Sequence, residues 1–307
     1  MSRPAVTVVV PTHNRPEMMA EAVQSVADQE YDGPIEIVVV FDASEPHDPA
    51  VTLGQDRTIV LTRNDRTRGL AGARNSGILV ASNELVAFLD DDDYWLPGKL
   101  EGQVAVFDIY PETLLVGTAM RIDDGRSFRD RLVPTDVVSR ADLISDRLAA
   151  LHSSSFLFRR RALVGDTAAV GLIDELLPGS YGEDYDILLR TARVSTIRVV
   201  NEPLVSVRWS GQSYFFGQWL LYATALQYLL AKHPDFADNS AATSRVQSQI
   251  AFALAASDHP ADATAWARRS LALRRTNVKA MLAIAVAKRI VSADRVLAIV
   301  RKFGKGI

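Results

Sequence analysis

The sequence predicts an α/β fold with a mostly parallel sheet flanked by helices. Short apolar segments alternate with segments of helical periodicity over most of the 307-residue chain, a pattern typical of strand–helix–strand units. One apolar strand, at residues 85–89, ends in four consecutive acids, Asp90 to Asp93. Because open α/β folds bind ligands at the carboxyl ends of their strands, these acids predict a ligand site at that edge.

The first part of the chain contains four expected strands, at residues 5–10, 35–41, 58–61 and 85–89. Helices are expected from Pro16, which suits a first helical turn, and over residues 69–81 and 97–109. Polar residues follow three of these strands: Thr12, Asp42 and the acidic cluster. Parallel strands end at one edge of the sheet, so a single ligand, such as a nucleotide, can touch all three.

In the second part of the chain, strand and helix patterns alternate less regularly. A strand is expected at residues 113–117, and the charged residues 121–150 are interpreted as a surface excursion. Further strands are expected at residues 153–158, 194–200 and 204–209, with a short basic helix start at 159–161, an amphipathic helix from Glu183 and a polar loop at 210–213. From residue 217 the pattern is helical, with helices expected over residues 246–256, 261–273, 278–290 and 295–300.

Composition limits the classes of site and the location. The chain has no cysteine, which excludes disulfides and thiolate metal sites. No signal peptide is evident at the start, and no apolar run approaches the ~18 residues that span a bilayer, so a cytoplasmic location is expected. Residues 263–307 carry eleven Lys or Arg and one acid, a net charge of +10 that leaves −13 on residues 1–262. This asymmetry predicts contact with an anionic surface, such as the inner face of a membrane, or a packed helical subdomain with a solvated basic face.

The acidic cluster is the strongest chemical signal. Adjacent carboxylates oppose each other's ionisation unless a cation lies among them, and oxygen ligands at this spacing suit Mg²⁺ or Mn²⁺. The alternative interpretation is a solvated turn that caps the next helix, which applies to Asp93 in particular. Glu183 and Asp184 form a second acidic site, although acids in the first turn of a helix are also explained by the helix dipole.

Five segments occur in the order expected of family 2 glycosyltransferases, which the chain resembles. They are residues 9–15 (VVPTHNR), 39–44 (VVFDAS), 69–77 (GLAGARNSG), 88–95 (FLDDDDYW) and 182–184 (GED). The resemblance covers about residues 5–210. It implies a GT-A-type, Rossmann-like fold and an inverting, metal-dependent enzyme that uses a UDP-, GDP- or dTDP-linked sugar and Mn²⁺ or Mg²⁺. The sequence of residues 232–240 predicts a domain break there. The expected domains are a GT-A domain over 1–235, with a nucleotide-sugar half at 1–118 and an acceptor half at 119–235, and a basic helical region at 236–307.

The resemblance assigns roles to individual residues. Asp184 matches the catalytic base, with Glu183 as its neighbour and structural partner. Asp92 and Asp90 match the outer acids of the Asp-X-Asp metal motif, with Asp92 the expected direct ligand. Arg74 is equally interpreted as a buried structural arginine, and residues 208–213 contain no histidine that could serve as a further metal ligand. The expected donor contacts are Thr12, Asp42, Arg68, Arg74, Asp90, Asp91 and Arg208, with His13 beside the donor loop.

The implied reaction transfers a sugar to an acceptor hydroxyl in the synthesis of cell-envelope polysaccharide, glycolipid or a glycosylated metabolite. The main alternative is a non-catalytic domain that binds a nucleotide-sugar or a partner. A nucleotidyltransferase is a further alternative, but residues 11–16 are a poor phosphate loop for that class. Nucleic-acid binding is disfavoured because aromatic residues are sparse in the basic segment. Peripheral membrane contact and homo-oligomer formation are left open.

Overall fold

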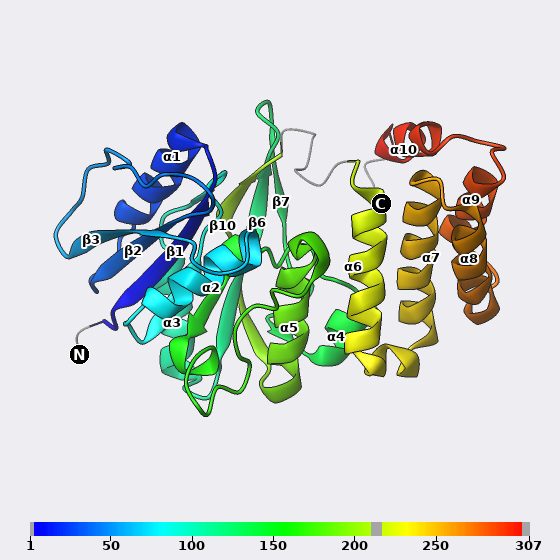
Figure 1. Cartoon of the computed structure of the whole chain (residues 1–307). Helices are drawn as coiled ribbons and strands as arrows, with labels where there is room; N and C mark the ends of the chain where they lie inside the picture. The colour runs from blue at the N-terminus through cyan, green and yellow to red at the C-terminus, as the bar shows by residue number, and fades with distance from the viewer. Residues whose placement is uncertain (1–2, 210–216, 303–307) are drawn as a thin grey trace. The chain divides into compact units, whose positions relative to one another are not determined.

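The computed structural model describes residues 3–209 and 217–302, with side chains described as far as Ala298 (Figure 1). The chain divides into two compact units. The first contains Met1–Leu143, Arg147–Glu175 and Glu183–Gly211, and the second contains Ile144–Asp146, Leu176–Gly182 and Gln212–Ile307. The domain boundary expected after residue 235 stays a prediction.

The first unit opens with four parallel strands in the order β3-β2-β1-β4 (Figure 1). Helix α1 connects β1 to β2, and α2 connects β3 to β4. Alternate residues of each strand point to opposite faces of the sheet, and helices cover both faces. On one face Val8 packs with α1 and α3, while on the other a Cβ added to Gly77 of α2 would lie 2.3 Å from Val9 Cγ1. The bounds of these elements are β1 Val6–Thr12, α1 Pro16–Ala27, β2 Ile35–Phe41, β3 Arg57–Arg63, α2 Leu70–Val80, β4 Leu85–Phe88 and α3 Lys99–Ile109. The predicted mostly parallel α/β sheet is confirmed.

Beyond β4 the sheet becomes mixed. β9 (Leu157–Arg159) lies antiparallel between β4 and β6 (Leu115–Asp123). β10 (Ile197–Arg208) runs parallel to β6, and β5 (Asp93–Trp95) pairs with β10 in the antiparallel sense. The shorter β7 (Phe128–Arg131) and β8 (Val137–Val138) pair with β6 and β10, and helices α4 (Arg140–Ser145) and α5 (Glu183–Val194) complete this part of the chain.

Three sequence expectations for this part of the chain are wrong. The two strands predicted at residues 194–200 and 204–209 are one strand, β10, whose register shifts on either side of Pro203. Proline removes a ladder donor and a bulge tolerates it, which divides the sequence pattern without ending the strand. Residues 121–150 are not only a surface excursion, because they contain the end of β6, β7, β8 and α4. Residues 153–155 form a 3₁₀ turn that precedes β9, not the start of a strand.

The second unit is helical, as the sequence predicts. It contains α6 (Trp219–Lys232), α7 (Ser240–Ala256), α8 (Pro260–Leu273), α9 (Val278–Ala287) and α10 (Ala293–Lys302), shown from yellow to red in Figure 1. Its core is rich in alanine, including Ala251, Ala267 and Ala283, and Leu271 and Ile284 pack against it. Much of the apolar surface of the basic segment is therefore used to pack helices together. Among the described residues, no helix has both the length and the apolar character needed to cross a membrane.

Candidate active site

The antiparallel pairing of β9 with β4 brings together the residues at the centre of the candidate site. Because β9 begins where β4 ends, the residues just before β9 lie beside those just after β4. Ser154 Oγ accepts a hydrogen bond from Asp90 N at 3.1 Å and donates one to Asp93 Oδ2 at 2.6 Å. The 3₁₀ turn that contains Ser154 is capped by His152, whose Nδ1 accepts from Ser154 N at 3.3 Å. Ser154, which lies 61 residues after Asp93 in the sequence, thus hydrogen-bonds to two members of the acidic cluster.

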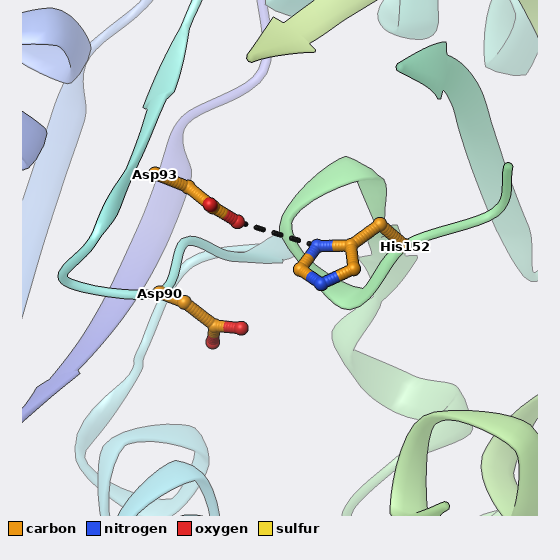
Figure 2. A group of neighbouring side chains, drawn as sticks. All are labelled: Asp90, Asp93 and His152. Carbon is orange, nitrogen blue, oxygen red and sulfur yellow. Dashed lines mark ion pairs between the residues drawn. The ribbon is translucent and has the colours of Figure 1, made fainter. Parts of the chain in front are cut away.

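Asp90, Asp93 and His152 form a group that could hold a metal ion. Figure 2 shows the three side chains directed toward a common space, and His152 Nδ1 lies 3.3 Å from Asp93 Oδ2. Each residue offers one ligand atom, and these atoms all lie within 4.8 Å of one another. Burial raises the pKa of Asp93 to about 7; His152 opposes this rise, and the neighbouring Asp90 and Asp92 add to it. A divalent cation would offset this accumulation of negative charge, so the oxygen and nitrogen donors present fit such a group.

Arg74 joins the two acidic parts of the site. Its side chain is 1% exposed, and it donates from Nη2 to Asp90 Oδ1 and from Nη1 to Glu183 Oε1, both at 2.5 Å. Ser153 Oγ accepts a further bond from Arg74 at 3.0 Å. Burial alone would raise the pKa of Asp90, but Arg74, His152 and Ser153 together outweigh it and the pKa is lowered. Burial dominates at Glu183, where the pKa rises to about 7 against the opposing effect of Arg74.

Asp184 lies beside Glu183 in the first turn of α5 and has a different environment. Arg147 Nη2 donates to Asp184 Oδ2 at 2.5 Å, and Tyr185 N donates to Asp184 Oδ1 at 2.7 Å. Burial raises the pKa of Asp184, but Arg147, His152 and the Tyr185 N–H together outweigh burial and the pKa is lowered, with Arg147 making the largest of these contributions. The Asp184 side chain is 11% exposed and that of Arg147 is 48% exposed. Asp184 is therefore an ionised carboxylate at neutral pH, held by a cation that reaches solvent.

A second cluster lies at the end of β1. Thr12 Oγ1 donates to Asp91 Oδ2 at 2.8 Å, and Arg15 Nη1 contacts Asp91 Oδ1 at 3.1 Å and Asp92 Oδ2 at 2.8 Å. Burial raises the pKa of Asp91 to about 6, while Thr12 and Arg15 oppose the rise. The side chain of Asp92 is 42% exposed, and its other oxygen accepts no hydrogen bond from the residues that the structure describes. Asp92 is the most accessible carboxylate of the Asp91–Asp92–Asp93 run.

Asp42 organises the loop that leads into α2. Its carboxylate accepts from Asn64 Nδ2 at 2.8 Å and from Gly69 N at 2.9 Å, and its carbonyl lies 2.6 Å from His13 Nδ1. Gly69 has a φ of 117°, which favours glycine, so part of the glycine-rich pattern serves the entry of α2. Asp42 thus links the ends of β1 and β2 to this loop. Arg68, in the same loop, is exposed.

Arg208 and the polar segment after it complete the expected contacts. Arg208 pairs with Glu21, stacks over Tyr94 with 5.4 Å between its guanidinium carbon and the ring centroid, and donates from its backbone N to Asp93 Oδ1 at 3.3 Å. The guanidinium is thus already paired with a carboxylate. The polar loop expected at residues 210–213 lies outside the described residues.

Sequence reasoning did not single out Arg15, Arg147 or His152 for a role. Arg15 belongs to a motif segment, but its carboxylate partners follow another strand 76 and 77 residues later. Arg147 and His152 lie in or just beyond a segment without clear periodicity. No local spacing identifies them, because the pairing of β9 and the start of α5 bring them to the acids.

Glu175 fastens the loop that carries Arg68, and its substitution has a defined pH signature. Its carboxylate accepts from Arg66 Nε at 2.5 Å, Asn75 Nδ2 at 2.7 Å and Thr67 N at 3.3 Å. Burial by itself raises the pKa of Glu175, but these hydrogen bonds lower it by more, and the resulting pKa is about 2. We expect Glu175→Gln to lower the free energy of unfolding by about 1.5–3 kcal/mol at neutral pH, as for bonds to a charged group.

The pH dependence of that loss follows from the lowered pKa. The stabilisation by Glu175 is fully present above the unfolded-state pKa of about 4.3 and disappears as pH falls toward 2. Denaturant unfolding of the two proteins should therefore converge over this interval. A difference that is unchanged between pH 6 and about pH 2 would contradict the ionic origin of the effect.

Comparisons with known proteins identify the family and the fold. The profile of the family described as Glycosyl transferase family 2 matches residues 7–165. A protein of Rickettsia felis named "Uncharacterized glycosyltransferase" is 27% identical over 223 residues, which cover 68% of this chain and 35% of that protein. The Escherichia coli UDP-Glc:alpha-D-GlcNAc-diphosphoundecaprenol beta-1,3-glucosyltransferase WfgD is 34% identical over 101 residues, which cover 33% of this chain and 40% of that protein. The chain spans less than two thirds of the length of either relative.

Two solved structures share the fold over nearly the whole chain. S. aureus TarS 1-349 in complex with UDP superposes with a TM-score of 0.55 at 19% identity and covers 98% of this chain and 92% of its own. The mannosyltransferase PcManGT from Pyrobaculum calidifontis, in complex with GDP-Man and Mn²⁺, has a TM-score of 0.56 at 20% identity and covers 98% and 85%. These likenesses confirm the predicted fold class, including the helical C-terminal region.

Proposed function

The chain belongs to glycosyl transferase family 2, and on that premise we propose that it moves a sugar from a nucleoside diphosphate to an acceptor hydroxyl, with inversion at the anomeric carbon. One observation carries the proposal. Arg74 is buried between Asp90, at the end of β4, and Glu183, at the start of α5. This pairing supports the proposal because one buried cation contacts both a proposed metal ligand, Asp90, and the neighbour of the proposed base, Glu183.

Asp184 is the proposed base. It removes the proton of the acceptor hydroxyl as that oxygen bonds to the anomeric carbon and the bond from this carbon to the diphosphate breaks. A single displacement of this kind inverts the centre and needs no carboxylate nucleophile. Asp184 is preferred to Glu183 because its pKa is lowered, which keeps it ionised, whereas Glu183 is bonded to Arg74 and its pKa is about 7. Glu183 is a positioning residue in this scheme.

Asp90 and Asp92 are the proposed metal ligands. A bound Mn²⁺ or Mg²⁺ supplies positive charge beside the departing diphosphate. Asp92 offers an exposed carboxylate with an oxygen that is not hydrogen-bonded to the described residues. Asp93 is 2% exposed, and both its oxygens already accept hydrogen bonds, from Ser154 and from Arg208 N. Asp93 and His152 are therefore assigned to holding the loop, and they remain the competing ligand set.

Substitutions of Asp92 and of His152 distinguish the proposed metal ligands from the competing set. We expect Asp92→Ala to abolish the Mn²⁺-dependent part of donor binding, whereas His152→Ala retains it. Within the run Asp90–Asp93, only Asp92 has a carboxylate oxygen that accepts no hydrogen bond from the described residues. Calorimetric titration with UDP-, GDP- and dTDP-sugars, with and without Mn²⁺, measures this dependence. UDP and GDP-mannose come first, since relatives of the same fold hold them. The opposite ranking of the two variants would move the ligands to Asp93 and His152.

The remaining donor contacts rest on the strand ends. Thr12 and Asp42 lie at the ends of β1 and β2, where the base and ribose of the donor are proposed to bind, and Asp91 is the proposed ribose partner. Arg208 and the exposed Arg68 are proposed to reach the diphosphate. Arg74 contributes indirectly, because its donors are directed to Asp90, Glu183 and Ser153.

The acceptor is proposed to be a saccharide, and the name of the E. coli relative favours a lipid-diphosphate-linked one. Peripheral membrane contact through the basic helices would bring such an acceptor within reach. The competing proposal is a domain that binds a nucleotide-sugar or a partner without catalysis. A folded sample that binds no donor in the titrations above would favour that alternative over transfer.

A further inference from the structure

A polar pocket lies within the second unit, at the amino-terminal ends of α7 and α9. Its volume is about 450 Å³. Three cations line it, Arg245 from α7, Arg274 from the loop after α8, and Lys279 from α9, together with polar side chains that include Asn239 and Asn277. No acidic residue lines the pocket among those that the structure describes.

The three cations of this pocket lack carboxylate partners. Within residues 3–209 and 217–298 none of them forms an ion pair, and the only hydrogen bond from Arg245 goes from Nη2 to the carbonyl of Ile144 at 3.0 Å. The Nε atom of Arg245 is buried and has no hydrogen-bond partner. Burial, followed by repulsion from Arg245, lowers the pKa of Lys279 to about 8. Like charges held together without a counter-ion are unfavourable, and a bound anion would remove that cost.

The helix ends around the pocket add partial positive charge. Asn239 caps α7 by accepting from Ala242 N at 3.0 Å, and Asn277 caps α9 by accepting from Ala280 N at 3.2 Å. The positive ends of two helix dipoles therefore point to one pocket. Asn277 is also fixed by bonds from Nδ2 to Ser244 O at 3.1 Å and Ser270 Oγ at 3.0 Å. Asn277 is therefore held in place at the start of α9.

We propose that this pocket binds a phosphate or diphosphate group. The two guanidinium groups and the amine in the lining provide many hydrogen-bond donors and at least two formal positive charges. Such a set matches a multiply charged oxyanion better than it matches a single carboxylate. The volume exceeds what one water or chloride ion needs. The pocket consists of residues of the second unit alone and shares none with the proposed donor, metal or base sites. The inference therefore goes beyond the proposed transfer reaction and does not depend on it.

The test uses the full chain, inorganic pyrophosphate as the probe and EDTA to exclude divalent cations. We expect pyrophosphate to raise the melting temperature of the native protein and of Lys288→Met, a matched control at the exposed C-terminal end of α9. Lys279→Met should lose this shift without losing basal stability, because it removes a partly buried cation that forms no ion pair with the described residues. Lys279→Arg should keep the shift. Equal shifts in Lys279→Met and Lys288→Met would place the bound pyrophosphate elsewhere and overturn the proposal.

Chemical protection locates the anion without any substitution. With its lowered pKa, Lys279 has a larger neutral fraction at neutral pH than an ordinary lysine, whose pKa is about 10.4. Limiting acetic anhydride followed by peptide mass spectrometry should therefore label Lys279 readily, and pyrophosphate should protect it but not Lys288. Unprotected labelling of Lys279 at pyrophosphate concentrations that raise the melting temperature would overturn the proposal, even if a variant failed to fold.

The same phosphate chemistry can come from a soluble molecule or from a lipid headgroup, and sedimentation with vesicles distinguishes the two sources. Vesicles of phosphatidylcholine with phosphatidic acid should sediment native protein and Lys288→Met more than Lys279→Met if the source is a lipid. Equal sedimentation of all three proteins, together with a pyrophosphate shift that depends on Lys279, assigns a soluble source. If Lys279→Met keeps both the pyrophosphate shift and the sedimentation with vesicles, both forms of the proposal are contradicted.

Discussion

Replacing Asp184 by asparagine is expected to reduce turnover by about 10²–10⁴-fold, the usual contribution of a positioned general base, and to leave donor binding nearly unchanged. Asparagine keeps the size of the side chain but cannot accept the hydroxyl proton. The Arg74 pair with Asp90 and Glu183 does not involve Asp184, so the cation and donor contacts should persist. Initial rates with the donor identified by titration, compared with calorimetric donor affinity, measure the two effects separately.

Asp136→Asn serves as the control, because Asp136 is an exposed acid of the same unit. Loss of donor binding in Asp184→Asn, with unfolding unchanged, would show that Asp184 belongs to the donor site. Turnover close to that of the native protein would remove Asp184 from catalysis and favour Glu183 as the base.

The pH profile of an Arg147→Gln variant tests the same assignment from another direction. Arg147 makes the largest contribution that lowers the pKa of Asp184 against the effect of burial, so its removal raises that pKa. A base acts only when deprotonated, so the acidic limb of kcat/KM should move to higher pH. An unshifted acidic limb would indicate that Asp184 does not set it.

Replacing Arg74 by methionine is expected to have the largest effect on stability, a loss of about 3–5 kcal/mol in the free energy of unfolding. Arg74 is buried, and its removal leaves the carboxylates of Asp90 and Glu183 without their cation. Removing one partner of a buried ion pair is costly because the other charge stays out of water. Denaturant unfolding followed by circular dichroism measures the loss.

Arg68→Met is the matched control, because Arg68 is an exposed arginine close in sequence, and a change within about ±0.5 kcal/mol is expected there. Adding Glu183→Gln to Arg74→Met should recover part of the lost stability, since the second substitution removes an unpaired buried charge. A double variant that is no more stable than Arg74→Met would indicate that packing of the arginine stem, not charge, sets the cost.

The sequence by itself determined the sheet and the chemical character of its edge. Apolar strands, helical periodicity and turn residues are local features, so β1 to β4 and the helices between them follow from short segments. The run from Asp90 to Asp93 is predicted at a ligand edge for the same reason, because it directly follows the apolar segment 85–89, which contains β4. The helical second unit was equally readable, although α7 begins six residues before the expected start because Asn239 caps it there.

Only the tertiary structure decided which groups meet. Arg74 could be a diphosphate contact or a buried arginine from the sequence, and the structure places it between Asp90 and Glu183, the latter 109 residues away. His152 reaches the acids because β9 runs antiparallel beside β4, and Arg147 reaches Asp184 across 37 residues. Such pairs depend on the order and direction of strands and on helix packing, which no local pattern encodes. The proximity of the cations Arg245 and Lys279 likewise follows only from the tertiary structure, because it results from the packing of α7 against α9.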